Sequence, residues 1–244
     1  MRRRGRATRR RPRWAFTVQR FPPCVARTHG ELDERSTRRL FCGVVNTRDR
    51  LVATAAQLYG RYGYTGVGLK QVASEAGVPI GSLYHFFPGG KEELAAEALR
   101  LSGHGYRLLV EGVFESAPDL VSGIRTCFDS AAEVLAATGY ADACWIETVA
   151  LEVASTNEPL RLVSAEIFDG WIDAATRLVE SGGVADAGSA RRLGIAIITG
   201  LEGAFVLSRA LRSPEPLHAA GESLVAAAEA ALQARPRVGK GGQR

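Results

Sequence analysis

The sequence has few of the groups on which catalytic and metal sites depend. It holds four Cys and four His in 244 residues, and no two Cys form a CxxC pair. It contains no GxxxxGK[ST] or GxSxG motif, no paired carboxylates at motif spacing and no Ser, His and Asp set. These absences argue against an enzyme, and they predict neither a metal site nor a cofactor.

Long apolar segments are also missing. The longest, Ile195 to Leu207, is interrupted by Glu202 and falls short of the roughly 18 residues that a bilayer span requires. The Arg-rich N-terminus lacks the apolar region of about 7–15 residues that a secretory signal contains. We therefore expect a soluble, cytoplasmic protein with no membrane partner. Its cysteines would be reduced, with Cys127 and Cys144 as small core residues, and a redox-sensing thiol is the alternative.

Basic charge is concentrated at the N-terminus. Residues 1–40 hold 13 Arg against three acidic residues, whereas the rest of the chain holds 18 basic and 23 acidic residues. The basic segment either contacts DNA phosphates without sequence preference or has no role. Residues 1–46 lack helical periodicity, so we expect a disordered tail there and a second one at residues 235–244.

A separate hypothesis is that the first tail is not translated. Arg outnumbers Lys 28 to 3, as in GC-rich coding sequences, which often use valine codons as starts. Translation would then begin at Val44 or Val45, and a native mass that includes residues 1–40 would contradict this idea.

From Asn46 onward, apolar residues recur at helical spacing and no strand-like alternation persists, so the sequence predicts an all-α fold. We expect helices at about residues 48–62, 69–76, 80–86, 91–114, 117–137, 143–154, 158–181, 189–212 and 216–234. Residues 69–86 have the pattern of a helix-turn-helix. Ala73 lies where two helices cross closely, and Gly77 lies where the turn needs a left-handed backbone. The outward residues of the second helix are small, polar or aromatic, which suits a major groove.

Residues 47–94 read TRDRLVATAAQLYGRYGYTGVGLKQVASEAGVPIGSLYHFFPGGKEEL. This segment closely resembles the DNA-binding domain of the TetR family, whose signature includes the LYHFF run followed by GKEEL. The additional glycine before Lys91 resembles the LmrA/YxaF-like branch of drug-responsive repressors. The EPLRL segment at 158–162 and the FDGW segment at 168–171 resemble the same branch. The resemblance covers about residues 47–234.

The resemblance implies an N-terminal helix-turn-helix DNA-binding domain at residues 47–92. A helical ligand-binding and dimerisation domain would follow at residues 93–234. The protein would be a homodimeric repressor that leaves double-stranded operator DNA when it binds a small hydrophobic inducer, apolar or aromatic. A ligand-independent DNA-binding protein and a transcriptional activator are the alternatives.

Seven residues are expected to contact DNA on the strength of this resemblance. Ser82 would lie nearest the bases, and Lys91 would hold a phosphate with its ammonium and its backbone N–H. Ile80 stands where a cation is common and could instead pack against a thymine methyl group. The predicted set is Lys70, Ile80, Gly81, Ser82, Tyr84, His85 and Lys91; packing or simple solvation is the alternative for the last three.

Bulky residues mixed with glycines in the C-terminal helices indicate either a ligand pocket or ordinary core packing. Two carboxylates lie within apolar stretches, where each would need an Arg, solvent or a cationic ligand as its partner. The predicted ligand-binding set is Phe128, Trp145, Glu147, Phe168, Trp171, Ile198, Glu202 and Phe205.

The last two helices predict a dimer interface. Residues 189–212 are apolar on more than one face, including a stripe of Leu193, Ile197, Gly200, Ala204, Leu207 and Leu211. In the final helix Leu217, Leu224 and Ala231 recur every seven residues. Two such helices from each subunit would form a four-helix interface, and burial of both faces within one subunit is the alternative. The helix that starts at Lys91 would be the lever between the domains, with bends at Gly103 and Gly105.

Overall fold

The computed structural model describes residues 46–141 and 144–234, and every regular element in them is an α-helix. The all-α prediction is therefore confirmed. The tails expected at residues 1–46 and 235–244 lie outside this range, apart from Asn46. The helices are α2 (Thr47–Tyr62), α3 (Leu69–Glu75), α4 (Ile80–Phe86), α5 (Gly90–Ser116), α6 (Leu120–Ala137), α7 (Trp145–Val153), α8 (Glu158–Ser181), α9 (Ala187–Leu211) and α10 (Glu215–Gln233).

Polar side chains fix where several helices begin. Asn46 caps α2 by accepting the backbone N–H of Asp49 at 2.8 Å. Asp119 and Asn157 cap α6 and α8 in the same way. Asp186 caps α9, which begins at residue 187, whereas the sequence suggested residue 189. Such caps satisfy N–H groups that the first turn leaves without partners.

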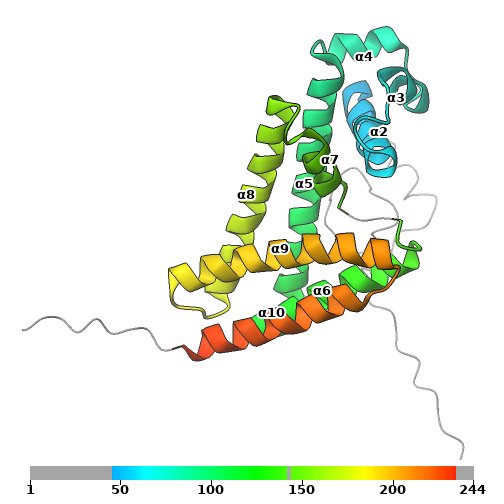
Figure 1. The fold of residues 1–244 in the computed structure, drawn as a ribbon. Helices are drawn as coiled ribbons and strands as arrows, with labels where there is room; N and C mark the ends of the chain where they lie inside the picture. Colours follow the sequence, from blue (N-terminus) through cyan, green and yellow to red (C-terminus); the bar gives the residue numbers. More distant parts are fainter. Residues whose placement is uncertain (1–45, 142–143, 235–244) are drawn as a thin grey trace, which may run out of the picture. The chain divides into compact units, whose positions relative to one another are not determined.

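The buried apolar residues form two clusters, which α5 connects. The head cluster joins α2, α3 and α4 to α7, to the first half of α5 and to the first part of α8. The body cluster joins α6, α9 and α10 to the end of α5. Figure 1 shows α2, α3 and α4 grouped at one end of α5. The same helix therefore contributes to the helix-turn-helix region and to the C-terminal helices.

Gly103 allows α5 and α8 to approach closely. It is buried, and an added Cβ would lie 2.7 Å from a methyl carbon of Ile167. The indole N–H of Trp171 donates to the Gly103 carbonyl at 2.8 Å. Residues 90–116 form one helix, so Gly103 serves close packing in this structure, whereas the sequence suggested a bend.

Helices α9 and α10 bury some of the stripes that were expected at a dimer interface. Leu217 is fully buried and Leu224 nearly so, and both belong to the body cluster. Leu193, Ile197 and Ala204 of α9 are buried as well. Leu217 and Leu224 of α10 therefore face their own subunit, and their assignment to a dimer interface was wrong.

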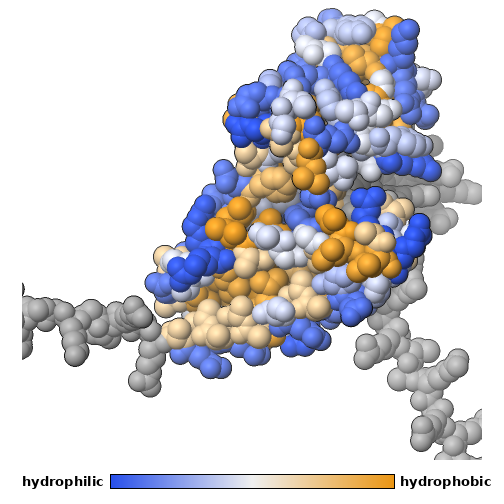
Figure 2. Space-filling model, viewed as in Figure 1, coloured by the Kyte–Doolittle hydropathy of each residue, from blue (hydrophilic) through white to orange (hydrophobic). Residues whose placement is uncertain are grey.

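A different part of α9 is both apolar and exposed. Val206, Leu207 and Leu211 expose 45 %, 54 % and 65 % of their surface, and Ile195 on an earlier turn exposes 39 %. Figure 2 shows apolar side chains over α9 and α10. By length and composition α9 is the one helix in the described ranges that could cross a membrane. One face of α9 packs against α8 and α10.

Candidate DNA-binding and ligand-binding sites

The helix-turn-helix has the geometry that its sequence predicts. Ala73 is buried where α3 meets its neighbours, and Gly77 has φ +65° in the turn. The N–H of Val78 donates to the Ala73 carbonyl at 3.0 Å and thereby closes the turn. Leu83 anchors α4 because its side chain is fully buried. These contacts hold α4 against α2 and α3, with its other face free.

The free face of α4 presents most of the residues predicted to contact DNA. Tyr84 exposes 54 % of its surface, and His85 is exposed beside the ring of Phe86. Ser82 is half-buried, and a Cβ added to Gly81 would meet open space, so a ligand can approach the backbone closely there. Ile80 is exposed on the same short helix. The structure thus brings five of the seven predicted residues together on one helix.

The two predicted lysines lie on neighbouring helices and differ in environment. Lys70 is exposed in the first turn of α3. Lys91, in the first turn of α5, is half-buried, and its Nζ lies 4.4 Å from the centre of the Tyr64 ring. The preceding Gly90 has φ +68°, which explains the additional glycine of the sequence. Glu93 accepts the N–H of Gly89 at 2.8 Å at the same turn.

The predicted ligand-binding residues fall into two groups. Trp145, Phe168, Trp171 and Ile198 pack with the head cluster, and Phe168 lies edge-on to Trp171 at 5.5 Å. Phe128 and Phe205 belong to the body cluster instead. Phe128 is fully buried against Gly200 and Gly221, where larger residues would crowd its ring. The structure therefore gives Phe128 a packing role within the body cluster.

Glu147 and Glu202 approach each other between α7 and α9, next to Cys144. The Cys144 thiol donates a hydrogen bond to the Glu202 carboxylate, while Glu202 Oε2 is buried and has no hydrogen-bond partner among the described residues. The pKa of Glu202 is raised to about 7, mainly by burial; the hydrogen bond from the Cys144 thiol opposes this rise, and the charge of Glu147 adds to it. Burial also raises the pKa of Glu147, which the charge of Arg209 opposes.

Cys144 and Cys127 are both free and buried, as the sequence predicted. Burial raises the pKa of the Cys144 thiol well above its usual range, and the neighbouring Glu202 charge adds to this effect. Both thiols are therefore protonated at neutral pH. The unusual group of the cluster is thus Glu202, a carboxyl that lacks a cationic partner.

Glu202→Gln is expected to stabilise the protein above pH 7. The pKa of Glu202 is raised from 4.5 to about 7 in the folded state, so the folded state binds the proton more tightly. The contribution of Glu202 to stability is then greatest below pH 4.5 and declines as the pH rises through about 7, by roughly 3 kcal/mol in total. Glutamine mimics the protonated carboxyl and removes this loss. Thermal unfolding from pH 5 to pH 8.5 measures the difference.

The exposed Glu222 of α10 provides the matched control, because Glu222→Gln makes the same chemical change where water solvates the carboxylate. We expect the two variants to unfold alike at pH 5 and to diverge as the pH rises. Parallel curves at all pH values would show that Glu202 is solvated in solution.

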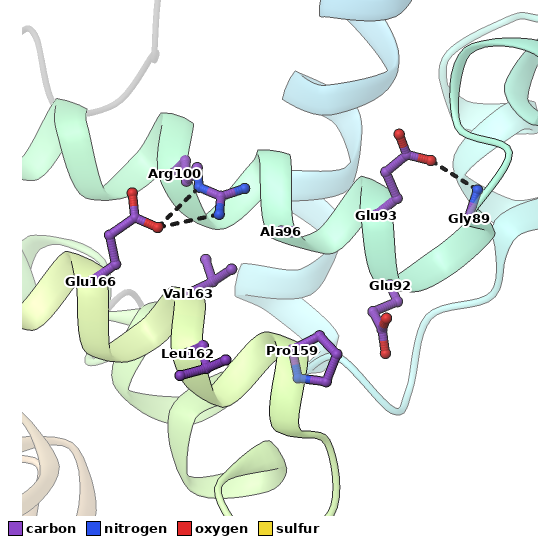
Figure 3. Close-up of a pocket in the computed structure, with 9 residues that line it drawn as sticks. All are labelled: Gly89, Glu92, Glu93, Ala96, Arg100, Pro159, Leu162, Val163 and Glu166. Atoms are coloured by element: carbon purple, nitrogen blue, oxygen red, sulfur yellow. Dashed lines mark hydrogen bonds and ion pairs between the residues drawn. The ribbon is translucent and has the colours of Figure 1, made fainter.

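A groove lies between the first halves of α5 and α8 (Figure 3), with a volume of roughly 370 Å³. Arg100 and Glu166 form an ion pair across it at 3.2 Å. Pro159 and Leu162, from the EPLRL segment, lie on the α8 side. None of the eight predicted ligand-binding residues lines this groove. The structure therefore separates this groove from the Glu147 and Glu202 cluster.

Sequence reasoning missed Glu152 at the end of α7. Its carboxylate accepts the backbone N–H of Thr65 at 3.0 Å and so joins α7 to the turn after α2. Trp145, also on α7, lies over Gly60, where an added Cβ would be 3.4 Å from the indole ring. In the sequence, Glu152 is one of two acidic residues on a short amphipathic helix. Nothing within that helix indicates its contact with the turn at Gly63 and Thr65, about 90 residues earlier.

Two family profiles match the chain. Residues 51–98 match the family described as "Bacterial regulatory proteins, tetR family". Residues 121–223 match the family described as "Transcriptional regulator LmrA/YxaF-like, C-terminal domain". The two matches cover the helix-turn-helix and most of the helices that follow α5.

Individual relatives agree with these profiles. The chain is 34 % identical over 172 residues to the uncharacterized HTH-type transcriptional regulator YxaF of Bacillus subtilis, covering 70 % of this chain and 90 % of that protein. It is 28 % identical to the transcriptional regulator LmrA of the same organism, covering 70 % and 91 %.

Solved structures show the same fold. A TetR transcriptional regulator from Chloroflexus aurantiacus aligns with a TM-score of 0.62 and 29 % identity, over 74 % of this chain and 92 % of that one. The reduced form of Escherichia coli NemR aligns with a TM-score of 0.64 and 24 % identity, over 73 % and 94 %.

Proposed function

Because the chain belongs to the TetR family of transcriptional regulators, in the LmrA/YxaF-like branch, we propose that it is a ligand-responsive repressor. It would bind operator DNA as a homodimer and leave it on binding a small hydrophobic inducer. The observation that supports DNA binding most directly is the free face of α4, which is held in place by the buried Leu83. Its place of action would be the cytoplasm, where the operator is.

In this proposal residues 47–92 form the DNA-binding domain, and α4 enters the major groove. Ser82 and Gly81 would lie nearest the base edges, with Ile80 against a thymine methyl group. Tyr84 and His85 would reach bases and phosphates. Lys70 and Lys91 would each hold a phosphate and so position the helix without reading sequence.

Residues 93–234 would bind the inducer and dimerise. The exposed apolar residues of α9, above all Leu207 and Leu211, together with the exposed alanines of α10, would meet the same surface of a second copy. Such a self-complementary surface is what a two-fold dimer requires. The two DNA-binding domains, one from each subunit, would then bind the two halves of a pseudo-palindrome.

The inducer would bind beside α7 and α9, where Glu147 and Glu202 lie near each other. Its apolar contacts would come from Trp145, Phe168, Trp171, Ile198 and Phe205. An apolar, aromatic molecule that is neutral or singly cationic fits this chemistry. A cation would supply the partner that Glu202 Oε2 lacks. Release requires that the inducer bind more tightly to the conformation that does not fit the operator. The long α5 is the proposed lever.

Tryptophan fluorescence tests the inducer proposal. With Trp14 replaced by Phe, emission comes only from Trp145 and Trp171. We expect a cationic aromatic dye or a neutral flavonoid of similar size to quench this emission and to lower operator affinity over the same concentrations. Trp145→Phe and Trp171→Phe, made singly, identify which indole lies nearer the compound.

A Glu202→Gln variant separates the two inducer classes, since it should weaken the dye and leave the flavonoid unchanged. If no compound of either class alters emission or operator affinity, the inducer proposal is wrong and DNA binding still stands. In that case the ligand-independent DNA-binding protein becomes the better description. A reporter gene that is expressed more strongly with the protein present would indicate an activator.

A further inference from the structure

Glu152 connects the C-terminal helices to the turn between α2 and α3. Its Oε2 accepts the Thr65 N–H at 3.0 Å, and its other oxygen lies against Gly63, where any side chain would collide with it. Gly63 ends α2 with φ +74°. One carboxylate from α7 therefore holds the backbone N–H that follows Tyr64 and lies against the glycine that precedes it.

The side chain of Tyr64 contacts Lys91, the residue proposed to hold a phosphate. The Lys91 ammonium lies 4.4 Å from the centre of the Tyr64 ring, a distance at which a cation is attracted to the ring face. Tyr64 in turn packs against Tyr59, with ring centres 5.8 Å apart. Lys91 thus rests on a ring whose backbone is held by another helix.

Glu152 also acts on Lys91 through its charge. Burial lowers the pKa of Lys91, and the negative charge of Glu152 opposes that change. The carboxylate therefore favours the charged form of Lys91, and it fixes the turn that carries the ring beneath it.

We propose that Glu152 is a positioning residue for DNA binding, which fixes the Lys91 ammonium through the Gly63–Thr65 turn and the Tyr64 ring. This inference rests on the proposed phosphate contact of Lys91. A lysine held in place loses less side-chain entropy when it meets a phosphate than one that moves freely. Glu152 shares the nine-residue α7 with Trp145 and Glu147. A ligand that displaces α7 would therefore disturb the Lys91 contact without any movement of α5 as a lever.

A double-mutant cycle on operator affinity tests this assignment. Glu152→Gln keeps an acceptor for the Thr65 N–H and removes the charge, whereas Glu152→Ala removes both. Comparing these two variants separates the loss of the hydrogen bond from the loss of a negative charge near DNA. We expect the Ala variant to bind operator about three- to tenfold more weakly than the Gln variant. In a Lys91→Met background the two should bind equally.

Tyr64 provides an independent arm with its own matched control. Tyr64→Leu removes the ring and should cost a similar factor, whereas Tyr64→Phe keeps the ring and should bind like the original protein. Neither Tyr64 substitution should change operator affinity in the Lys91→Met background. Thermal unfolding of each variant shows whether the fold is retained.

Three results would overturn the inference, and they differ from failure of the proposed function. If the Ala and Gln variants also differ in the Lys91→Met background, Glu152 acts elsewhere. If they bind equally with Lys91 present, Glu152 positions nothing. If Lys91→Met alone has no effect, the phosphate contact and this inference both fail although operator binding persists. Absence of specific DNA binding by the unmodified chain would contradict the proposed function itself.

Discussion

Replacing Leu207 by Glu will convert the dimer to a monomer and lower operator affinity by about 100- to 10,000-fold. Leu207 exposes 54 % of its surface in one subunit, next to Val206 and Leu211 on the outer face of α9. Across a two-fold axis each substitution occurs twice, so two carboxylates would be buried near each other in an apolar interface. The monomeric variant would then bind DNA through a single DNA-binding domain. Analytical ultracentrifugation and gel-shift titration measure both effects.

Leu151→Glu is the matched control, because Leu151 exposes 74 % of its surface but lies on α7, outside the exposed residues of α9 and α10 that are proposed to form the interface. This variant should sediment and bind operator like the original protein. A Leu207→Glu protein that stays dimeric would show that another surface forms the interface. A monomer that keeps full operator affinity would contradict the proposal that two DNA-binding domains bind the operator together.

Operator affinity will fall by about 10³- to 10⁵-fold between 50 and 200 mM salt if the dimer neutralises about 6–10 phosphates. Each neutralised phosphate releases counterions from the DNA, and added salt opposes that release. Lys70 and Arg50 of the DNA-binding domain are exposed and so are available to phosphates. Arg48 is engaged with Glu97 at 3.0 Å and with the Phe87 ring. Fluorescence anisotropy of a labelled operator, titrated at several salt concentrations, gives the slope.

Two variants distinguish residues that hold phosphates from residues that contact base edges. Lys91→Ala removes one proposed phosphate contact per head and should lower the salt slope by about two for the dimer, on every DNA sequence alike. Ser82→Ala should leave the slope unchanged and alter the preference among operator sequences. The Arg-rich residues 1–40 are the same in the unmodified protein and in both variants. Differences in the salt slope therefore come from the substituted residue of the DNA-binding domain. An unchanged slope for Lys91→Ala would remove its phosphate role.

The sequence by itself determined the helix-turn-helix and most helix boundaries, because these depend on local interactions. Ala73 and Gly77 meet steric demands within a few residues of themselves, and the structure ends α3 and begins α4 where these residues predict. Asn46 is a residue type that favours the cap position, and it caps α2 by accepting the N–H of Asp49. A motif of this kind also made the family recognisable, since its residues are consecutive.

Only the tertiary structure decided what each apolar or charged side chain faces. Periodicity places Leu217 and Leu207 on apolar stripes alike, yet Leu217 is buried in its own subunit and Leu207 is exposed. Aromatic content likewise could not show that Phe128 packs in the body cluster while Trp171 packs in the head cluster. The contact of Glu152 with Thr65 joins residues 87 positions apart, and no local pattern encodes it. Spacing along a helix specifies a face, but its partner depends on how the other helices fold against it.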